Sequence, residues 1–333
     1  MAADIGTLIA GLERGERRAL ARLLTLAEDG LPEQLRDVIG GLYAATGRAR
    51  VIGVTGSPGV GKSTLTNAIA AELRSRDRSV AILAVDPSSP FSGGALLGDR
   101  VRMQSHHADP GVFIRSMAAR GHLGGLSFAT PQAVLVLDAA GFDDVIVETV
   151  GVGQSEVEIA ATADTTVVTL APGMGDGIQA AKAGILEVAD IFVINKADRG
   201  GAGQLESELR GMLEMGHAVQ EVGDEAGWWP PIVRCVAVRS EGITELLDAL
   251  AAHGDHLDDS GQRERRARDR ALHTIREIAL EHIRVRFARL DHGDDPMLEA
   301  LAEKVAARDV DPYSAADDLL EAIEGGFDSA GDG

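Results

Sequence analysis

The feature that most constrains the fold of this chain is a glycine-rich octapeptide that begins at Gly56 and ends with Lys62 and Ser63. It follows a short β-branched run at residues 51–55 and precedes a segment with helical character at residues 64–74. A strand, a glycine-rich turn and a helix in this order form a phosphate-binding loop, in which backbone N–H groups and the helix N-terminus surround phosphate oxygens. The motif therefore predicts a nucleotide site.

Further short β-branched runs recur along the chain, separated by segments with helical spacing. With the run at 51–55 they lie at residues 80–85, 145–147, 166–170, 191–194 and 232–238. This alternation predicts an α/β fold, a P-loop NTPase core with a mainly parallel sheet and helices on both faces.

A second motif, Asn195-Lys196-Ala197-Asp198, follows the predicted strand at 191–194. Parallel strands place their carboxyl ends at the ligand-binding edge of such a sheet. An aspartate carboxylate accepts from both N1–H and the 2-amino group of guanine, whereas adenine has neither donor. The motif predicts GTP and GDP as ligands. The later run Ala237-Val238-Arg239 is expected to end the last strand and to cover the base with a backbone N–H.

Three carboxylates near predicted strand ends, Asp86, Asp99 and Glu148, are candidates for binding Mg²⁺ together with the hydroxyl of Ser63. Singly, each carboxylate is more often a helix cap or a solvated turn residue. A divalent cation changes that weighting, because it offsets the repulsion between carboxylates and commonly uses them as ligands.

Catalytic roles follow from the same motifs. Lys62 is expected to reach the β- and γ-phosphates, the N–H of Gly151 to contact the γ-phosphate, and Gln154 to orient the attacking water. The predicted catalytic residues are Lys62, Asp86, Asp99, Glu148 and Gln154. The predicted nucleotide-binding residues are Gly56, Ser57, Pro58, Gly59, Val60, Gly61, Lys62, Ser63, Thr64, Gly151, Asn195, Lys196, Asp198, Ala237, Val238 and Arg239.

Helical spacing extends on either side of the predicted sheet. Residues 1–48 are expected to form an N-terminal helical extension with Pro32 in a first helical turn, residues 49–254 the P-loop GTPase domain, and residues 255–333 a C-terminal helical dimerisation region. Asp311 and Pro312 are expected to begin the last helix, as N-cap and first helical residue.

Composition excludes several other classes of protein. The formal net charge of -20, from 32 basic and 52 acidic residues, repels nucleic acid and anionic membranes, and only 3% of residues are aromatic. The apolar runs are too short to cross a bilayer. The one cysteine, Cys235, allows no internal disulfide. We expect a cytoplasmic protein that binds neither nucleic acid nor membrane.

Together the motifs resemble the MeaB/ArgK GTPases, the G-proteins that attend methylmalonyl-CoA mutase and related B12-dependent acyl-CoA mutases. The resemblance covers about residues 50–240. The matching segments are residues 53–64, 85–94, 97–100, 147–156, 172–176 and 190–198.

This resemblance implies a GTPase of the SIMIBI class that works as a homodimer, with phosphate or Mg²⁺ bound at Lys62, Ser63, Asp86, Asp99 and Glu148 and a mobile switch at residues 172–182. It implies a chaperone whose GTP cycle gates adenosylcobalamin loading of an acyl-CoA mutase and protects that mutase. The apolar stripe from Leu272 to Phe287 agrees with a dimer held by the C-terminal helices, although packing on the sheet is the alternative.

Two other functions stay open from the sequence. A nickel-insertion GTPase needs cysteine and histidine ligands, and this chain has a single cysteine and no histidine-rich tract. A kinase linked to amino-acid transport is an older description of ArgK relatives, but the chain has no His-Arg-Asp triplet of a kinase catalytic loop.

Overall fold

The computed structural model describes residues 4–87, 109–119, 129–149, 159–173, 188–220, 227–291 and 296–328. The chain divides into two compact units, Met1–His273 and Thr274–Gly333, each described by itself. The first unit holds the sheet and all the residues of the predicted site that the structure describes.

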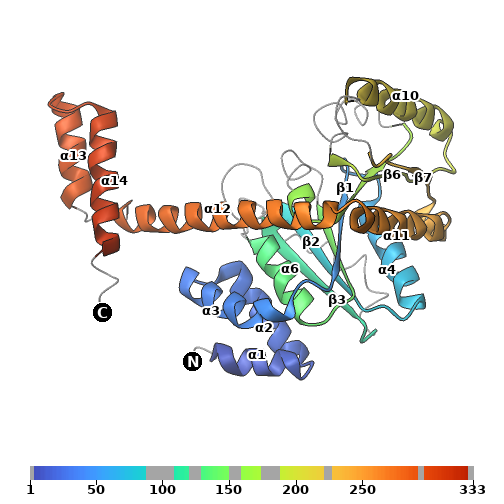
Figure 1. The fold of residues 1–333 in the computed structure, drawn as a ribbon, viewed down its shortest axis with the longest axis horizontal. Coiled ribbons are helices and arrows are strands. Elements are labelled where there is room, and N and C mark those ends of the chain that lie inside the picture. The colour runs from blue at the N-terminus through green and yellow to red at the C-terminus, as the bar shows by residue number, and fades with distance from the viewer. Residues whose placement is uncertain are drawn as a thin grey trace. The chain divides into compact units, whose positions relative to one another are not determined.

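A seven-stranded sheet with the order β3-β2-β4-β1-β5-β6-β7 forms the centre of the first unit, and every neighbouring pair is parallel. This confirms the predicted α/β fold (Figure 1). The strands are β1 (Arg50–Thr55), β2 (Val80–Pro87), β3 (Val112–Ala119), β4 (Asp144–Thr149), β5 (Thr165–Leu170), β6 (Ile191–Ile194) and β7 (Ile232–Arg234).

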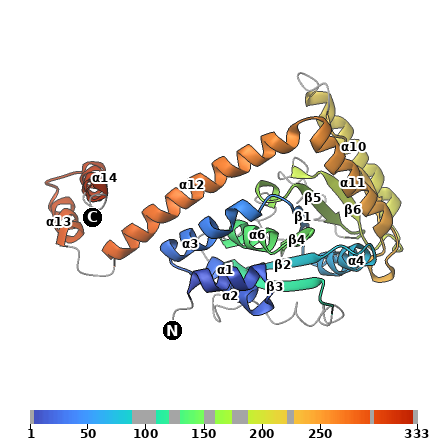
Figure 2. The same cartoon turned by 60° about the horizontal axis from the view of Figure 1, so that its bottom comes forward.

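Helices cover both faces of the sheet, because the strand side chains that point to each face are apolar. In β4, Val145 and Val147 pack towards one face and Ile146 towards the other, and all three are fully buried. The first face is covered by α1 (Ile5–Glu13), α2 (Arg17–Asp29), α3 (Pro32–Leu42) and α6 (Ala129–Ala139). The second is covered by α4 (Lys62–Ser75) and α11 (Ile243–Asp259), which lie near one another in Figure 2. On the first face, α10 (Ala202–Gln220) packs on β5 and β6.

Two expectations about strands were wrong. β3 was not predicted, because its residue Arg115 interrupts the apolar run; in the structure Arg115 pairs with Glu28 of α2 at 2.6 Å. The last strand ends at Arg234 instead of continuing to Val238, and a 3-10 turn, η5 (Ala237–Arg239), replaces its expected end. Other 3-10 turns among the described residues are η1 (Tyr43–Ala45) and η3 (Ile159–Ala161).

The helix starts predicted at two prolines are confirmed. Pro32 is the first residue of α3, and α14 (Pro312–Asp328) begins after Asp311, whose carboxylate accepts from the backbone N–H groups of Tyr313 at 2.9 Å and Ser314 at 3.1 Å. The second unit contains α14 and α13 (Pro296–Ala307). The domain boundaries at residues 48 and 254 stay predictions.

A polar cluster lies where β5 and β6 begin, at the edge opposite the predicted nucleotide site. Asp190, which is 6% exposed, accepts from Arg266 at 2.8 Å and from the backbone N–H of Thr166 at 2.8 Å, and its Oδ1 lies 3.2 Å from Nε2 of the buried His253. Arg270 pairs with Asp164 at 2.9 Å. Both arginines belong to α12 (Gln262–Asp291), whose first turns they anchor to the sheet.

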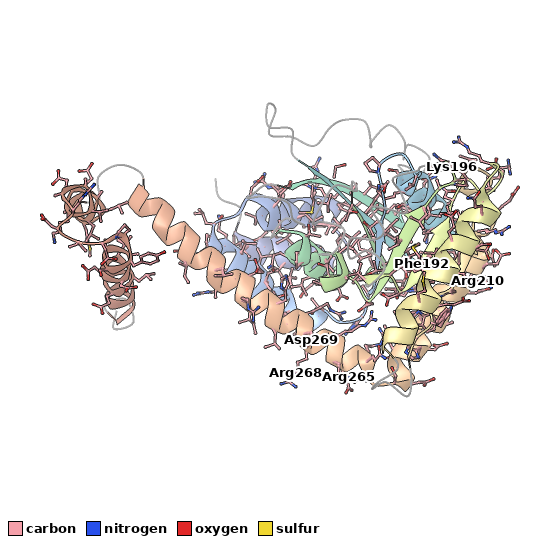
Figure 3. All side chains as sticks on the ribbon, turned by 90° about the horizontal axis from the view of Figure 1, so that it is seen from above. Phe192, Lys196, Arg210, Arg265, Arg268 and Asp269 are labelled. Carbon is pink, nitrogen blue, oxygen red and sulfur yellow. The ribbon has the colours of Figure 1, made fainter. Side chains whose placement is uncertain are left out.

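The opposite side of the same helix start is exposed. Arg265, Arg268 and Asp269 point away from the sheet there (Figure 3). In the arginine-rich run at residues 263–270, Arg266 and Arg270 therefore anchor the helix, whereas Arg265 and Arg268 face solvent.

Candidate functional site

The glycine-rich loop connects β1 to α4, as the sequence predicts. Gly56 has φ of 136°, and a Cβ there would lie 2.1 Å from the carbonyl oxygen of Thr169 on β5. Gly61 is the N-cap of α4 with φ of 99°, and a Cβ there would lie 2.5 Å from Nδ2 of Asn195. Only glycine fits at these two positions, because the backbone is left-handed or nearly so and neighbouring groups approach closely.

Lys62 and Ser63 open α4 directly after this loop. The side chain of Lys62 is 6% exposed, and its Nζ donates to the carbonyl oxygens of Gly56 at 2.6 Å and Ser57 at 3.1 Å. The ammonium therefore lies over the loop. The first turn of α4 begins at the same place, and helix N-termini favour anions.

Glu148 meets the loop from the neighbouring strand. It lies near the carboxyl end of β4, in register with Val54 of β1 and Ala84 of β2, and is 6% exposed. The Ser63 hydroxyl donates to its Oε1 at 2.5 Å, so two of the predicted Mg²⁺ ligands are in direct contact. Next to them, the hydroxyls of Thr149 and Thr55 are hydrogen-bonded at 2.9 Å.

Of the remaining groups predicted near Ser63 and Glu148, the structure describes only the backbone position of Asp86. Asp86 lies at the carboxyl end of β2, in register with Ala118 of β3. Asp99, Gly151 and Gln154 lie outside the described residues. Their roles stay predictions.

Asn195 connects three loops at the end of β6. It is 2% exposed, and its Nδ2 donates to the carbonyl oxygen of Val60 at 3.0 Å. Its Oδ1 accepts from the backbone N–H of Ala237 at 3.1 Å and from that of Lys196 at 2.8 Å. The phosphate loop, the Asn195–Asp198 loop and the turn η5 are thereby fixed to one another.

Lys196 adds a second connection to the phosphate loop. Its backbone is left-handed with φ of 57°, and its Nζ donates to the carbonyl oxygen of Gly59 at 2.5 Å. Figure 3 labels Lys196 just beyond β6, the strand that holds the buried Phe192.

Asp198 ends the same loop with a partly exposed carboxylate. Nη1 of Arg239 lies 3.3 Å from its Oδ2, and Arg239 also donates from Nε to Oε1 of Glu241 at 2.8 Å. The pKa of the Arg239 guanidinium is raised, mainly by its hydrogen bond to Glu241. Glu241 and the side-chain role of Arg239 were not predicted, because no sequence motif marks them and their pairing depends on the turn between them.

The turn η5 differs from the strand end that the sequence predicts. The N–H of Ala237 donates to Asn195, and the N–H of Arg239 donates to the carbonyl oxygen of Val236 at 2.8 Å. These two N–H groups hold the turn in place. The expected cover of the base by a backbone N–H from this segment stays a prediction.

Cys235 lies just before the turn, and its environment does not favour metal binding. Burial, together with the charge of Glu245, raises the pKa of its thiol to about 12, which keeps the thiol protonated at neutral pH. Metal ions bind the thiolate form.

Among the residues that the structure describes, no helix combines the length and the apolar character needed to cross a membrane.

Comparison with known proteins agrees with this arrangement. The sequence profile of the family described as "Methylmalonyl Co-A mutase-associated GTPase MeaB" matches residues 20–291. A relative from Pyrococcus abyssi is 48% identical over 323 residues, which are 97% of this chain and 98% of the relative. The GTPase ArgK of Escherichia coli is 38% identical over 288 residues, 84% of this chain and 85% of ArgK.

A solved structure extends the likeness to three dimensions. The crystal structure of a LAO/AO transport system kinase superposes with a TM-score of 0.64 at 28% sequence identity, covering 97% of this chain and 99% of that one. The phosphate loop, the Asn195–Asp198 loop and the parallel sheet are those of a guanine-nucleotide hydrolase, and the family profile spans most of the chain. The chain belongs to the MeaB family of GTPases.

Proposed function

We propose that this protein is a Mg²⁺-dependent G-protein chaperone for a B12-dependent acyl-CoA mutase, methylmalonyl-CoA mutase or a relative of it. GTP binding and hydrolysis would gate the loading of adenosylcobalamin and protect the mutase. The observation that carries the proposal is the family match over residues 20–291, whose description names this mutase. A relative in Caenorhabditis elegans, named methylmalonic aciduria type A homolog, is 35% identical over 283 residues.

The groups around Ser63 fit a magnesium ion. A hydroxyl and a buried carboxylate in contact at 2.5 Å provide hard oxygen ligands beside the phosphate loop, which is the donor set that Mg²⁺ prefers. Ser63 and Glu148 would hold the ion, with Asp86 and Asp99 completing the site directly or through water. When bound, Mg²⁺ neutralises charge on the phosphate oxygens.

The protein's own residues supply the rest of the chemistry. Lys62 would exchange the carbonyl oxygens of Gly56 and Ser57 for β- and γ-phosphate oxygens, which stabilises charge as the bond to the γ-phosphate breaks. Gln154 would orient the water that attacks the γ-phosphorus, giving GDP and phosphate.

Guanine is selected by Asp198 in this proposal. The carboxylate accepts from N1–H and the 2-amino group, while the backbone of η5 closes the pocket. Support comes from Asn195, which fixes the loop of Asp198 against both η5 and the phosphate loop.

GTP hydrolysis by one variant and nucleotide binding by another test these roles. Lys62→Ala should abolish GTP hydrolysis. Arg76→Ala should leave it unchanged, because Arg76 is an exposed arginine at the C-cap of α4 that pairs with Glu72. Asp198→Asn should lose GTP and gain xanthosine triphosphate, since the amide donates to the 2-oxo group. Normal turnover by Lys62→Ala at saturating GTP contradicts the phosphate role.

The partner is tested by affinity capture. The tagged protein is incubated with the mutase in two separate samples, one with GTP and one with GDP, and the bound mutase is quantified in each. Nucleotide-dependent retention supports the proposal. Equal absence of the mutase in both samples contradicts it.

A further inference from the structure

The carboxylate proposed to read guanine already has a partner in the protein. Nη1 of Arg239 lies 3.3 Å from Oδ2 of Asp198, while the rest of the same guanidinium holds Glu241, with Nε to Oε1 at 2.8 Å and Nη2 to Oε2 at 3.4 Å. One arginine is thus shared by two carboxylates, of which only one belongs to the guanine motif.

The chemistry of the guanidinium resembles that of the base edge. Guanine presents N1–H and its 2-amino group to a carboxylate, and arginine presents two N–H groups in a similar planar fork. A base that uses both oxygens of Asp198 has to share Oδ2 with Arg239 or displace it, because both donors draw on the same acceptor atom. Glu241 gives the withdrawn guanidinium a partner, because it already accepts from two of its nitrogens.

We propose that Arg239 competes with guanine for Asp198 and thereby lowers the affinity of the site for GDP and GTP. This inference rests on the proposed guanine-reading role of Asp198. The side chains of Arg239, Asp198 and Glu241 are 50%, 39% and 58% exposed, so they can exchange partners without disturbing the core. Solvent screening keeps the competition modest, with an effect of about two- to fivefold on affinity.

Adenine nucleotides should respond differently. Adenine offers Asp198 no donor, so Arg239 can remain paired with the carboxylate when ADP binds. The arginine therefore reduces the penalty of leaving Asp198 unpaired beside the wrong base. Its removal should widen the difference between GDP and ADP.

Isothermal titration of GDP and ADP into the full-length protein tests this competition. Arg239→Ala should bind GDP about two- to fivefold more tightly than the wild type, with no gain for ADP. The matched control is Arg210→Ala, which removes the same charge from an exposed arginine on α10 paired with Glu206 at 2.9 Å (Figure 3). It should leave both affinities unchanged.

The sign of the effect separates this proposal from ordinary electrostatics. Removing a positive charge near an anionic nucleotide weakens binding, whereas relief from competition strengthens it. Weaker GDP binding by Arg239→Ala therefore overturns the proposal and indicates that the guanidinium contacts the nucleotide instead. Unchanged GDP binding overturns it as well.

Two further variants complete the test. Glu241→Gln removes the second carboxylate, leaves Arg239 to Asp198, and should weaken GDP binding about two- to fivefold. In an Asp198→Asn background, Arg239→Ala should change the affinity for xanthosine diphosphate by less than about twofold, because no carboxylate remains to compete for.

The same set distinguishes two kinds of failure. If Asp198→Asn does not gain xanthine nucleotides, the guanine-reading role itself is wrong. If Asp198→Asn gains them but Arg239→Ala does not tighten GDP binding, only the competition is wrong.

Discussion

Single residues at the nucleotide edge are held by backbone groups more than by side-chain pairs. Asn195 contacts three loops through main-chain N–H and C=O groups, and Lys62 and Lys196 both donate to carbonyl oxygens of the phosphate loop. Such contacts require a fixed loop conformation, which the glycines allow. A substitution that shifts the loop should therefore affect folding and nucleotide binding together.

Gly56→Ala should destabilise the protein and abolish nucleotide binding. The new Cβ would approach the Thr169 carbonyl oxygen to 2.1 Å in a backbone with φ of 136°, so strand or loop must move. Strain of this kind costs on the order of 1–3 kcal/mol or more. Gly40→Ala is the control, because its Cβ would meet nothing within 4 Å on the helix α3, and there alanine stabilises by up to about 1 kcal/mol. Urea unfolding measures the stability of both variants. Equal unfolding midpoints for Gly56→Ala and Gly40→Ala would contradict the steric explanation.

At the scale of secondary-structure elements, partly exposed arginines anchor the first turns of α12 to two buried carboxylates at the starts of β5 and β6. Burial alone would raise the pKa of Asp190, but hydrogen bonds from His253 and Arg266 outweigh it and hold that pKa below its ordinary value. The folded state therefore favours the ionised carboxylate, which contributes to stability above the unfolded pKa of about 4. This contribution is lost as pH falls through the lower folded-state pKa.

Asp190→Asn should cost about 1.5–3 kcal/mol at neutral pH, because Arg266, whose side chain is 35% exposed, loses the buried carboxylate that it pairs with. The variant should also lose less stability than the wild type between neutral pH and about pH 3, since it has no carboxylate to protonate there. Asp258→Asn, which affects an exposed pair with Arg263, should change the midpoint little. Urea titrations at several pH values test this prediction. If the free energy of unfolding depends on pH in the same way for Asp190→Asn and the wild type, the Asp190 carboxylate is not the source of the pH dependence.

The sequence predicted elements well where a pattern is local and less well where tertiary contacts decide. β-branched runs identified six strands, and proline and aspartate marked the helix starts at Pro32 and Pro312. β3 was missed because Arg115 breaks its apolar run, and that arginine is accommodated by Glu28 from another layer. The end of β7 was overextended because Asn195, distant in sequence, fixes Ala237 in a turn. The same long-range pairing hides the contact of Arg239 with Asp198 from any sequence motif.

For the whole molecule, we propose a homodimer held by the C-terminal helices. Within this region Leu272 and Ile275 are 57% and 65% exposed on α12, and Ile283 is 40% exposed, which is unusual for large apolar residues on one helix. A chain truncated after Gly254 should therefore be monomeric, if it keeps its fold. Light scattering measures mass, and circular dichroism checks folding. Charged substitutions at Leu272 and Ile275 in the full chain are the second test, because they leave the anchoring arginines in place. A full-length variant of this kind that remains dimeric would exclude the helix as the interface.

The last prediction concerns the exchange of free energy between the nucleotide site and the mutase. The described part of the phosphate loop, residues 56–63, contains no arginine that could act as a built-in finger, so the isolated GTPase should turn over slowly and a bound partner should accelerate it. If the GTP and GDP states differ in affinity for the mutase, linkage requires the mutase to change the ratio of GTP to GDP affinity by the same factor. We would measure turnover and both nucleotide affinities with and without the mutase, and measure mutase affinity in each nucleotide state. Lys62→Ala serves as the control for turnover that comes from a contaminating enzyme. The two factors must agree within error, because they describe one thermodynamic cycle. A mutase that binds, yet changes neither turnover nor the ratio of nucleotide affinities, would show that the GTP cycle does not act on this partner.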